Sequence, residues 1–536
     1  MVRVGGGEIF DELLTAVSFT WNNNVENQQK YHVVSGAAGT VSAAGGWLGS
    51  GGLSGNNGMR LYGVGVDQVL HVEMVLPSGV HVRFGPTKWS QEAGKMYHVT
   101  TDVTGYCNMG DLADESSWDW QMCSDHGMHF DKLWYAVRGG GGGTYGVVTA
   151  VYYQLHKLPG SIQTTTVHLS LLLGNIGDDN IAVQTIVTSG WVEFILKFFF
   201  APQLVGVAES VSNSCSSPGN GGFKGGFFVC FDGAADVMRT AWRKYLDDKF
   251  TDDSLRELWN TDEVLDGYFV VEENDSWADY LLSTYPGIFP GIPDIPIPAV
   301  YSDFGTLCDE EVGCWYTGQY LMFPIEAIVT KMDKLAEMIT YCTYVDFVIP
   351  GVLDSCDGGA MYIMGGMIPS ADDGMNSLSV HRRKGGFQMV VLTPVARTQF
   401  QQLFYGVSDG EVVTGDSFPG ALDHNHASAD FPTPLKDDWT KACDMRWSEE
   451  EREEKCLSFQ ETAWGTDILK ELEKIHEHVD PHHLFQCWDC VDYPKNDEKA
   501  SLEEKDSKDE TSSSSHKKSK AGWTLLLAAL MFSVCH

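Results

Sequence analysis

Two glycine-rich segments are the parts of this chain best suited to hold a ligand against bare backbone. Eleven glycines fall within residues 36–65, and five consecutive glycines run from Gly139 to Gly143. Backbone without side chains can approach a ligand closely, and its N–H groups can bind phosphate oxygens. Because a predicted hairpin separates the two segments, they indicate one extended, phosphate-bearing ligand. Tight turns in a β-rich protein explain the same glycines equally well.

The spacing of these glycines excludes two common nucleotide motifs. Neither segment reads GxxxxGK[ST], which a P-loop nucleotide hydrolase requires, and no strand–GxGxxG–helix unit of a Rossmann site is present. The ligand that we expect is therefore a dinucleotide cofactor in a glycine cradle of another kind.

Strands and helices must position the two segments. The runs Val69–Leu76 and Val80–Phe84 flank Pro77-Ser78-Gly79, which predicts a β-hairpin. Apolar residues at helical spacing predict helices over residues 8–18, 234–244 and 445–480, whereas five prolines in 286–298 indicate a loop. We expect a strand over 133–137, the glycine loop, a strand over 147–151, and a polar, irregular insertion over 86–130.

Composition limits the class of protein. The chain has 536 residues, of which 43% are hydrophobic, so it can bury a large core over several domains and is not globally disordered. Lys and Arg total 36 against 73 Asp and Glu, which gives a net charge of −37. Because phosphate neutralisation needs clustered Lys and Arg, nucleic acid is not an expected partner.

Twelve of the thirteen cysteines lie in close sequential pairs, among them Cys107/Cys123 and Cys215/Cys230. An even number at short spacing favours disulfides formed in an oxidising compartment. Buried free thiols are the alternative. The pairing does not follow from the sequence, because neighbours along the chain need not be neighbours in space.

Three segments, taken in order, resemble the FAD-linked oxidoreductases of the vanillyl-alcohol oxidase (PCMH-type) superfamily, in its berberine-bridge-like branch. Residues 40–54 resemble the second flavin loop of that family, and residues 62–70 continue the match. Residues 138–149, which read RGGGGGTYGVVT, resemble a later flavin-contacting segment. Residues 479–491 resemble the closing motif of the family.

This resemblance implies an enzyme with FAD as its cofactor. It would move hydride from a small alcohol, sugar or amine-type donor to the flavin, with O2 as the usual reoxidant. The residues that would line the cofactor are Gly45, Gly46, Gly51, Gly52, Ser54, Gly63, Asp67, Gly139, Gly140, Gly141, Gly142, Gly143, Thr144, Gly146 and Val148. Asp423 and His426 are the nearest counterparts of the family's catalytic base, and a solvated polar loop is the alternative there.

The implied fold class is α+β. A PCMH-type FAD-binding domain over residues 1–158 would contain the second subdomain with the first one missing. A substrate domain over 159–439 would hold an antiparallel sheet flanked by helices, and residues 440–493 would return to the FAD domain. Residues 494–520 are expected to form a disordered linker and residues 521–536 a hydrophobic tail.

The two ends of the chain bear on where it acts. No charged leader with an apolar run follows Met1, which we interpret as a truncated start that also lacks the pyrophosphate loop and any covalent flavin residue. Small residues at 512–515, a polar spacer and an apolar stretch over 522–534 match a lipid-anchor signal, and a frayed terminus is the alternative. We therefore expect an extracellular or cell-surface protein, held to a membrane only through such an anchor.

A metal site is not expected at the histidine-rich end of the chain. His476 and His478 are two residues apart and point to different faces of a helix, and Pro481 interrupts the turn before the next two histidines. The resemblance implies a disulfide or a packed pair for Cys487 and Cys490 instead.

Two other readings of the chain remain open. It could be a non-catalytic extracellular scaffold, or a fragment that has lost flavin binding. The glycine segments favour the enzyme, because a decayed site has no reason to keep so many flexible residues.

Overall fold

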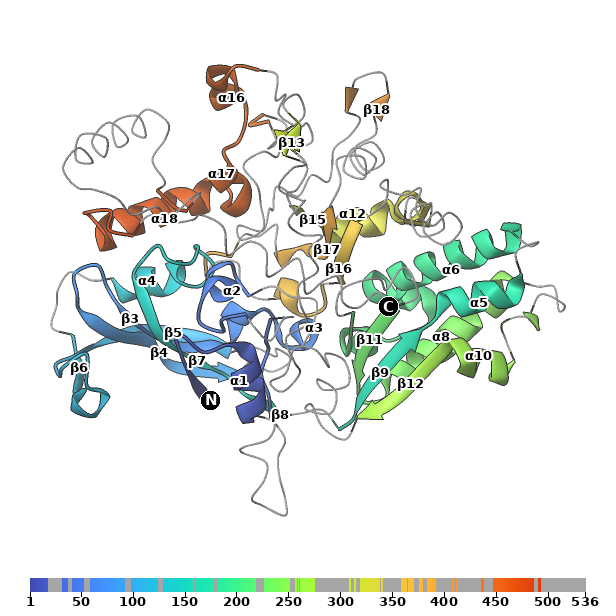
Figure 1. The fold of residues 1–536 in the computed structure, drawn as a ribbon, viewed down its shortest axis with the longest axis horizontal. Helices are drawn as coiled ribbons and strands as arrows, with labels where there is room; N and C mark the ends of the chain where they lie inside the picture. Colours follow the sequence, from blue (N-terminus) through green and yellow to red (C-terminus); the bar gives the residue numbers. More distant parts are fainter. Residues whose placement is uncertain are drawn as a thin grey trace, which may run out of the picture.

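The computed structural model describes the parts of the chain that form two sheets with their helices and several smaller elements (Figure 1). The described residues are 1–17, 31–36, 41–52, 58–91, 98–123, 129–157, 160–177, 181–217, 226–250, 256–257, 259, 261–274, 308–309, 313–314, 319–337, 339–340, 358–363, 365–370, 376–378, 383–391, 407–408, 411–412, 435–437, 447–485 and 490–492. Asp423, His426, the proline-rich segment and the last 44 residues of the chain, 493–536, lie outside them.

The first sheet has six strands in the spatial order β1-β7-β3-β4-β5-β6, and every pair is antiparallel. The strands are β1 (Val2–Gly5), β3 (Val69–Val75), β4 (His81–Gln91), β5 (His98–Asn108), β6 (Trp120–Met122) and β7 (Val147–Tyr153). The predicted hairpin is confirmed, since β3 pairs with β4 and Val72 lies opposite Phe84. The predicted strand after the glycine loop is confirmed as β7.

Residues 86–130 are not the irregular segment that the sequence predicted. Strand β4 continues to Gln91, and β5 pairs with it from Val82↔Cys107 to Gln91↔His98. The reason lies in the β-branched residues of β5, whose side chains pack well on a pleated surface. A disulfide between Cys107 and Cys123 ties β5 to the residue that follows β6.

Residues 133–137 form a helix rather than the predicted strand. Helix α4 (Phe130–Ala136) buries Leu133 and Trp134, and Val137 follows on the same face. Phe130, Leu133, Trp134 and Val137 stand at the i, i+3, i+4, i+7 spacing of one helical face, which a window of five residues does not reveal. The prediction for the N-terminal helix is confirmed by α1 (Phe10–Thr15).

A second sheet follows along the chain, in the order β10-β11-β9-β12, again antiparallel. Its strands are β9 (Ile162–Val167), β10 (Cys215–Ser216), β11 (Gly226–Phe231) and β12 (Phe269–Asn274). Its helices are α5 (Leu169–Ile176), α6 (Ile181–Phe200), α7 (Glu209–Asn213), α8 (Ala234–Lys249) and α10 (Asp262–Tyr268), grouped beside the sheet in Figure 1. Helix α6 is long and apolar enough to cross a membrane, but its aromatic residues are buried in this body's own core.

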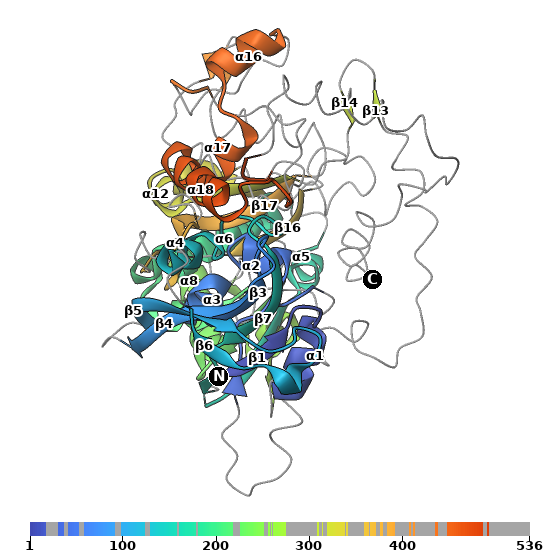
Figure 2. The same ribbon diagram turned by 90° about the vertical axis from the view of Figure 1, so that its left-hand side faces the viewer.

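Smaller elements complete the described structure. A three-stranded sheet β15-β17-β16 combines Gln319–Pro324, Gly385–Val391 and Gly358–Ile363, with α12 (Ile325–Thr330) directly after β15. The others are β2 (Tyr31–His32), α2 (Gly46–Gly49), α3 (Met59–Tyr62), β8 (His156–Lys157), β13 (Cys308–Asp309), β14 (Gly313–Cys314), β18 (Val407–Ser408), β19 (Glu411–Val412) and four 3₁₀ turns, Gly65–Gln68, Glu115–Ser117, Pro202–Val205 and Ile368–Ser370. The charged segment predicted to be helical forms α16 (Glu449–Lys455), α17 (Phe459–Trp464) and α18 (Thr466–Val479). Both views place α18 on the side of the first sheet that carries α4 (Figures 1 and 2).

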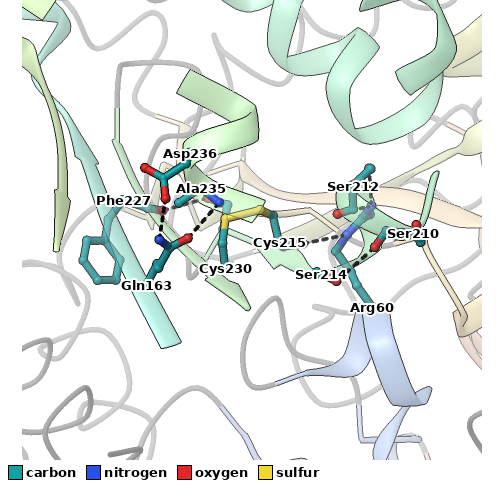
Figure 3. Close-up of a disulfide and its surroundings, with 11 residues drawn as sticks. Arg60, Gln163, Ser210, Ser212, Ser214, Cys215, Phe227, Cys230, Ala235 and Asp236 are labelled. Carbon is teal, nitrogen blue, oxygen red and sulfur yellow. Dashed lines mark hydrogen bonds between the residues drawn. A yellow bond between two sulfur atoms is a disulfide. The ribbon is translucent and has the colours of Figure 1, made fainter. Parts of the chain in front are cut away.

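Arg60 connects the first body to the second. From α3 its guanidinium donates to the Cys215 carbonyl (3.0 Å) and to the Ser212 hydroxyl (3.2 Å) (Figure 3). Cys215 is disulfide-bonded to Cys230 of the neighbouring strand, which fixes that carbonyl on the sheet edge. Burial lowers the pKa of Arg60 to about 9, so the side chain stays charged at neutral pH.

Candidate functional site

The two glycine-rich segments meet, although about ninety residues separate them in sequence. The Gly141 N–H donates to the Gly49 carbonyl at the end of α2 (2.9 Å). A Cβ atom on Gly49 would lie only 2.5 Å from the Gly142 nitrogen, so backbone touches backbone. The segments predicted to cradle one ligand therefore form one continuous backbone surface.

Several of these glycines are required by the protein's own packing. A Cβ on Gly52 would lie 2.6 Å from the Gly65 Cα, where the Gly65 N–H donates to the Gly52 carbonyl (3.0 Å). Gly51 and Gly139 both have positive φ; a Cβ on Gly51 would meet the Leu378 side chain, and a Cβ on Gly139 would lie 2.8 Å from the Leu378 nitrogen. Close packing against backbone or against Leu378 accounts for these positions without a ligand.

A second group of glycines lies at the open edge of the same surface. Gly46 and Gly143 are exposed, and Gly45 and Gly142 are half-buried. Nothing lies within 4 Å of the position where Gly143 would carry a Cβ, and its φ of 73° is one that glycine favours. The backbone of these four residues is the part of the surface that a ligand can reach.

Thr144 follows these glycines and carries a polar atom that the protein does not satisfy. Its side chain is fully buried, and its Oγ1 has no hydrogen-bond partner among the residues that the structure describes. A buried hydroxyl without a partner costs roughly 1–3 kcal/mol, so natural proteins rarely leave one unless a ligand or water satisfies it. Gly45, Gly46, Gly142, Gly143 and this hydroxyl therefore fit a phosphate-bearing cofactor such as FAD.

Two buried arginines lie at the base of the glycine loop. Buried Arg138 donates from Nε to the Trp134 carbonyl (3.1 Å), and its guanidinium lies 4.2 Å from the centre of the Trp134 ring. Burial lowers the pKa of Arg138 to about 9, and the nearby Asp67 carboxylate opposes that shift. Asp67 itself pairs with Arg383 (2.8 Å). The guanidinium groups of Arg138 and Arg383 thus both lie near the Asp67 carboxylate at the base of the loop.

Asp67, predicted to line the cofactor, is held by the protein itself. Its carboxylate accepts hydrogen bonds from Arg383, from the Asn376 amide (3.2 Å) and from the Val64 N–H (3.2 Å). The side chains of Asp67 and Arg383 are 5% and 1% exposed. This buried network joins the turn after Gly63 to a segment more than 300 residues later.

The remaining predicted residues fall into three groups. A Cβ atom on Gly140 or Gly146 would lie 2.4 Å from the Ala136 carbonyl oxygen or 2.5 Å from the Val75 carbonyl oxygen, and one on Gly63 would lie 2.9 Å from the Asp67 carboxylate, so packing accounts for all three glycines. Val148 is half-buried on β7. Ser54 lies outside the described residues, as do the two predicted catalytic residues. Their contacts with cofactor or substrate stay predictions.

Three residues that the sequence analysis did not assign to this surface also contact it. The Ser377 N–H donates to the Arg138 carbonyl (3.2 Å), and the Trp464 indole N–H donates to the Gly139 carbonyl (2.9 Å). The Cys490 sulfur lies 3.9 Å from the Gly142 carbonyl oxygen. No local pattern marks the first two, because each reaches a partner hundreds of residues away; the third belongs to the segment that resembles a family motif.

Comparison with known proteins finds a curated relative of the kind that the motifs predict. No protein-family model matches the chain. The FAD-linked oxidoreductase ffsJ of Aspergillus flavipes is 28% identical over 149 residues, which are 27% of this chain and only 16% of that protein. The similarity to FAD-linked oxidoreductases is thereby confirmed for about a quarter of the chain.

Solved structures of flavoproteins are similar as well. The VAO-type flavoprotein MtVAO615 of Myceliophthora thermophila C1 is 15% identical, with a TM-score of 0.48 and coverage of 90% of this chain and 65% of its own. The oxidoreductase GilR, which catalyses the terminal step of gilvocarcin biosynthesis, is 14% identical, with a TM-score of 0.48 and coverage of 91% and 81%.

Proposed function

We propose that this chain is an FAD-dependent oxidoreductase whose two glycine segments form the cofactor cradle. The observation that carries the proposal is the meeting of the two segments at Gly49 and Gly141, beside a buried Thr144 hydroxyl that no protein group satisfies. The sequence similarity to an FAD-linked oxidoreductase supports the choice of cofactor. The buried guanidinium groups of Arg138 and Arg383 at the base of the loop would attract an anionic ligand.

The chain's own groups have separate tasks in this proposal. The exposed backbone at Gly46 and Gly143 lets a flat ring or a diphosphate lie against the polypeptide, and its N–H groups can donate to phosphate oxygens. The Thr144 hydroxyl donates a hydrogen bond to the same ligand or accepts one from it. Arg138 and Arg383 offset the negative charge of the diphosphate. When bound, FAD supplies a two-electron acceptor for hydride.

The proposed donors are small alcohols, sugars or amines, with O2 as the reoxidant. Loss of hydride from a C–H bond requires that a proton leave the donor's oxygen or nitrogen, so a base is needed. Asp423 and His426 are our candidates for that base. Replacing them by Asn and Gln should lower kcat at unchanged FAD content, and unchanged kcat in both variants would exclude them.

An extracellular or cell-surface location is part of the proposal. The Cys107–Cys123 and Cys215–Cys230 disulfides support it, because such bonds persist in oxidising compartments. The apolar stretch over 522–534 is proposed as the signal for a lipid anchor. Expression of the full-length chain, followed by release of the processed protein from cells by an enzyme that cleaves the lipid, tests the anchor directly.

Thr144 offers a sharp test of the cradle. Replacement by Val keeps the shape and removes a hydroxyl that has no partner in the protein, so the apo chain should be at least as stable as before. If the hydroxyl binds FAD, loss of about 1.4 kcal/mol of binding energy weakens FAD affinity about tenfold. Thr165 in β9 is the matched control, because it too is fully buried and its Oγ1 also has no partner.

FAD titration of the full-length protein, followed by flavin absorbance, decides between the outcomes. The proposal predicts that Thr144→Val weakens FAD binding whereas Thr165→Val does not. A folded wild-type chain that binds no FAD would overturn the function and favour the scaffold reading. Equal affinity in all three proteins would remove Thr144 from the site.

A further inference from the structure

Three metal-ligating side chains come together at the C-terminal end of α18 and in the segments that follow it. His476, His483 and Asp492 each offer one ligand atom, and these atoms lie within 4.8 Å of one another. We propose that they bind a divalent cation of the zinc class. The inference does not depend on the proposed oxidoreductase function.

Two of the three distances between the ligand atoms are close to those around a tetrahedral ion, and the third is at most 4.8 Å. Asp492 Oδ2 lies 3.3 Å from His476 Nδ1 and 3.1 Å from His483 Nδ1. Metal–ligand bonds of ~2.0–2.2 Å place the ligand atoms of a tetrahedral zinc ion ~3.3–3.6 Å apart. Hydrogen bonds from two imidazoles to one carboxylate have similar lengths. The surrounding charges must therefore decide between such hydrogen bonds and a bound metal ion.

A second carboxylate favours the cation. Asp480 is fully buried beside His476, with its Oδ2 3.7 Å from His476 Nε2. Within the described parts of the chain, imidazoles are the only groups at ion-pair distance from Asp480 or Asp492. A divalent ion held by neutral imidazoles would offset both carboxylates, and a buried charge requires such compensation.

Asp480 lies on the side of His476 where a metal site places its outer partner, at 3.7 Å, which is longer than a hydrogen bond. A histidine that binds a metal through one ring nitrogen usually donates its other N–H to a carboxylate, which fixes the ring. Here Nδ1 of His476 faces Asp492, and Nε2 faces Asp480. Asp480 is held in turn by the Phe485 N–H, which donates to its Oδ2 (2.7 Å).

The backbone holds two of the ligands in an uncommon conformation and leaves the site open to solvent. His483 and Asp492 have φ values of 50° and 61°, in the left-handed region that few side-chain-bearing residues adopt. Their side chains are 44% and 37% exposed, whereas that of His476 is 1% exposed. An ion can therefore enter from water, and water can supply a fourth ligand.

The site would fix the segment at 490–492 against the glycine loop. Asp492 lies two residues after Cys490, whose sulfur is 3.9 Å from the Gly142 carbonyl oxygen. On its other side the His476 ring lies edge-on to Tyr145 of the loop, with ring centres 6.2 Å apart. The ion would thus join α18, the turn after it and the segment at 490–492 beside the loop.

Metal binding to the full-length, disulfide-intact protein tests this inference. Equilibrium dialysis with Zn²⁺ should give one ion per chain, and Co²⁺ should give the visible absorption of a tetrahedral site. His483→Ala and Asp492→Asn should each weaken Zn²⁺ binding at least tenfold. Loss of the outer carboxylate in Asp480→Asn should weaken it by roughly 10–100-fold.

The adjacent, exposed His482 is the matched control. His482→Ala should keep the wild-type Zn²⁺ affinity, and circular dichroism should show that each variant is folded. Zn²⁺ should also raise the thermal midpoint of the wild type but not of His483→Ala, because a ligand that binds only the folded state stabilises it. Absence of stoichiometric binding, or an equal loss in His482→Ala and His483→Ala, would overturn the site.

Discussion

Replacing Gly49 by Ala tests whether the two glycine segments form one rigid surface. The added Cβ would lie 2.5 Å from the Gly142 nitrogen, 2.6 Å from its Cα and 2.9 Å from the Gly141 carbonyl carbon. All three atoms belong to backbone, so none can rotate away. Since carbon atoms pack at ~3.5–4.0 Å, the two segments would have to separate by about 1 Å.

The expected cost combines two effects. Overpacking of this kind destabilises a protein by about 1–3 kcal/mol. Separation also stretches the hydrogen bond from Gly141 to the Gly49 carbonyl, whose loss costs about 1 kcal/mol. We therefore expect a loss of about 2–4 kcal/mol in unfolding free energy, together with weaker FAD binding, because the open edge lies on the same segments.

Urea unfolding followed by tryptophan fluorescence measures the change, and Gly174→Ala is the control. Gly174 is an exposed residue in α5, with nothing within 4 Å of its Cβ position. Alanine should therefore stabilise that helix by about 0.5–1 kcal/mol. A Gly49→Ala protein with the stability and FAD affinity of the wild type would refute the contact between the two segments.

Three further predictions follow from buried charges and a disulfide. Asp67→Asn removes the carboxylate that pairs with the buried Arg383 guanidinium and should destabilise the fold by about 3–5 kcal/mol, whereas a change below 0.5 kcal/mol in urea unfolding would contradict the pairing. Burial disfavours the Glu193 carboxylate, but hydrogen bonds from Lys197 and a second lysine outweigh it and lower its pKa from 4.5 to about 2. This contribution to stability should be present above pH ~4.5 and lost as the pH falls toward 2. If the unfolding free energy of Glu193→Gln changes with pH in that range as much as that of the wild type, this reasoning is wrong. Cys215→Ser opens a disulfide that spans 15 residues and should cost about 3 kcal/mol, seen as a lower thermal midpoint, and an unchanged midpoint would count against that bond.

Local sequence patterns predicted the elements that depend on short-range signals. The hairpin at 69–84 followed from two apolar runs around a Pro-Ser-Gly turn, and α8 followed from helical spacing. The meeting of the two glycine segments was predicted from the idea of one shared ligand. Residues 133–137 alone do not show the helical spacing that begins at Phe130, so the strand predicted there was wrong.

Features that depend on distant residues could not be predicted from the sequence. The pairing of Asp67 with Arg383 spans 316 residues and has no local signal. The approach of His476 to His483 depends on how the chain turns at Pro481, so the helix spacing alone argued against a shared site. The sequence also cannot tell which glycines pack against other parts of the protein and which are exposed to a ligand, because their neighbours come from distant parts of the chain.

Hydrogen exchange with and without FAD tests the central claim, that Gly45–Gly52 and Gly139–Gly146 together hold the cofactor. In the full-length protein, we predict that FAD slows exchange of backbone amides in both segments at once. Peptides from α5 and α8 in the second body should not change. Protection confined to other parts of the chain, or to one glycine segment alone, would contradict the account.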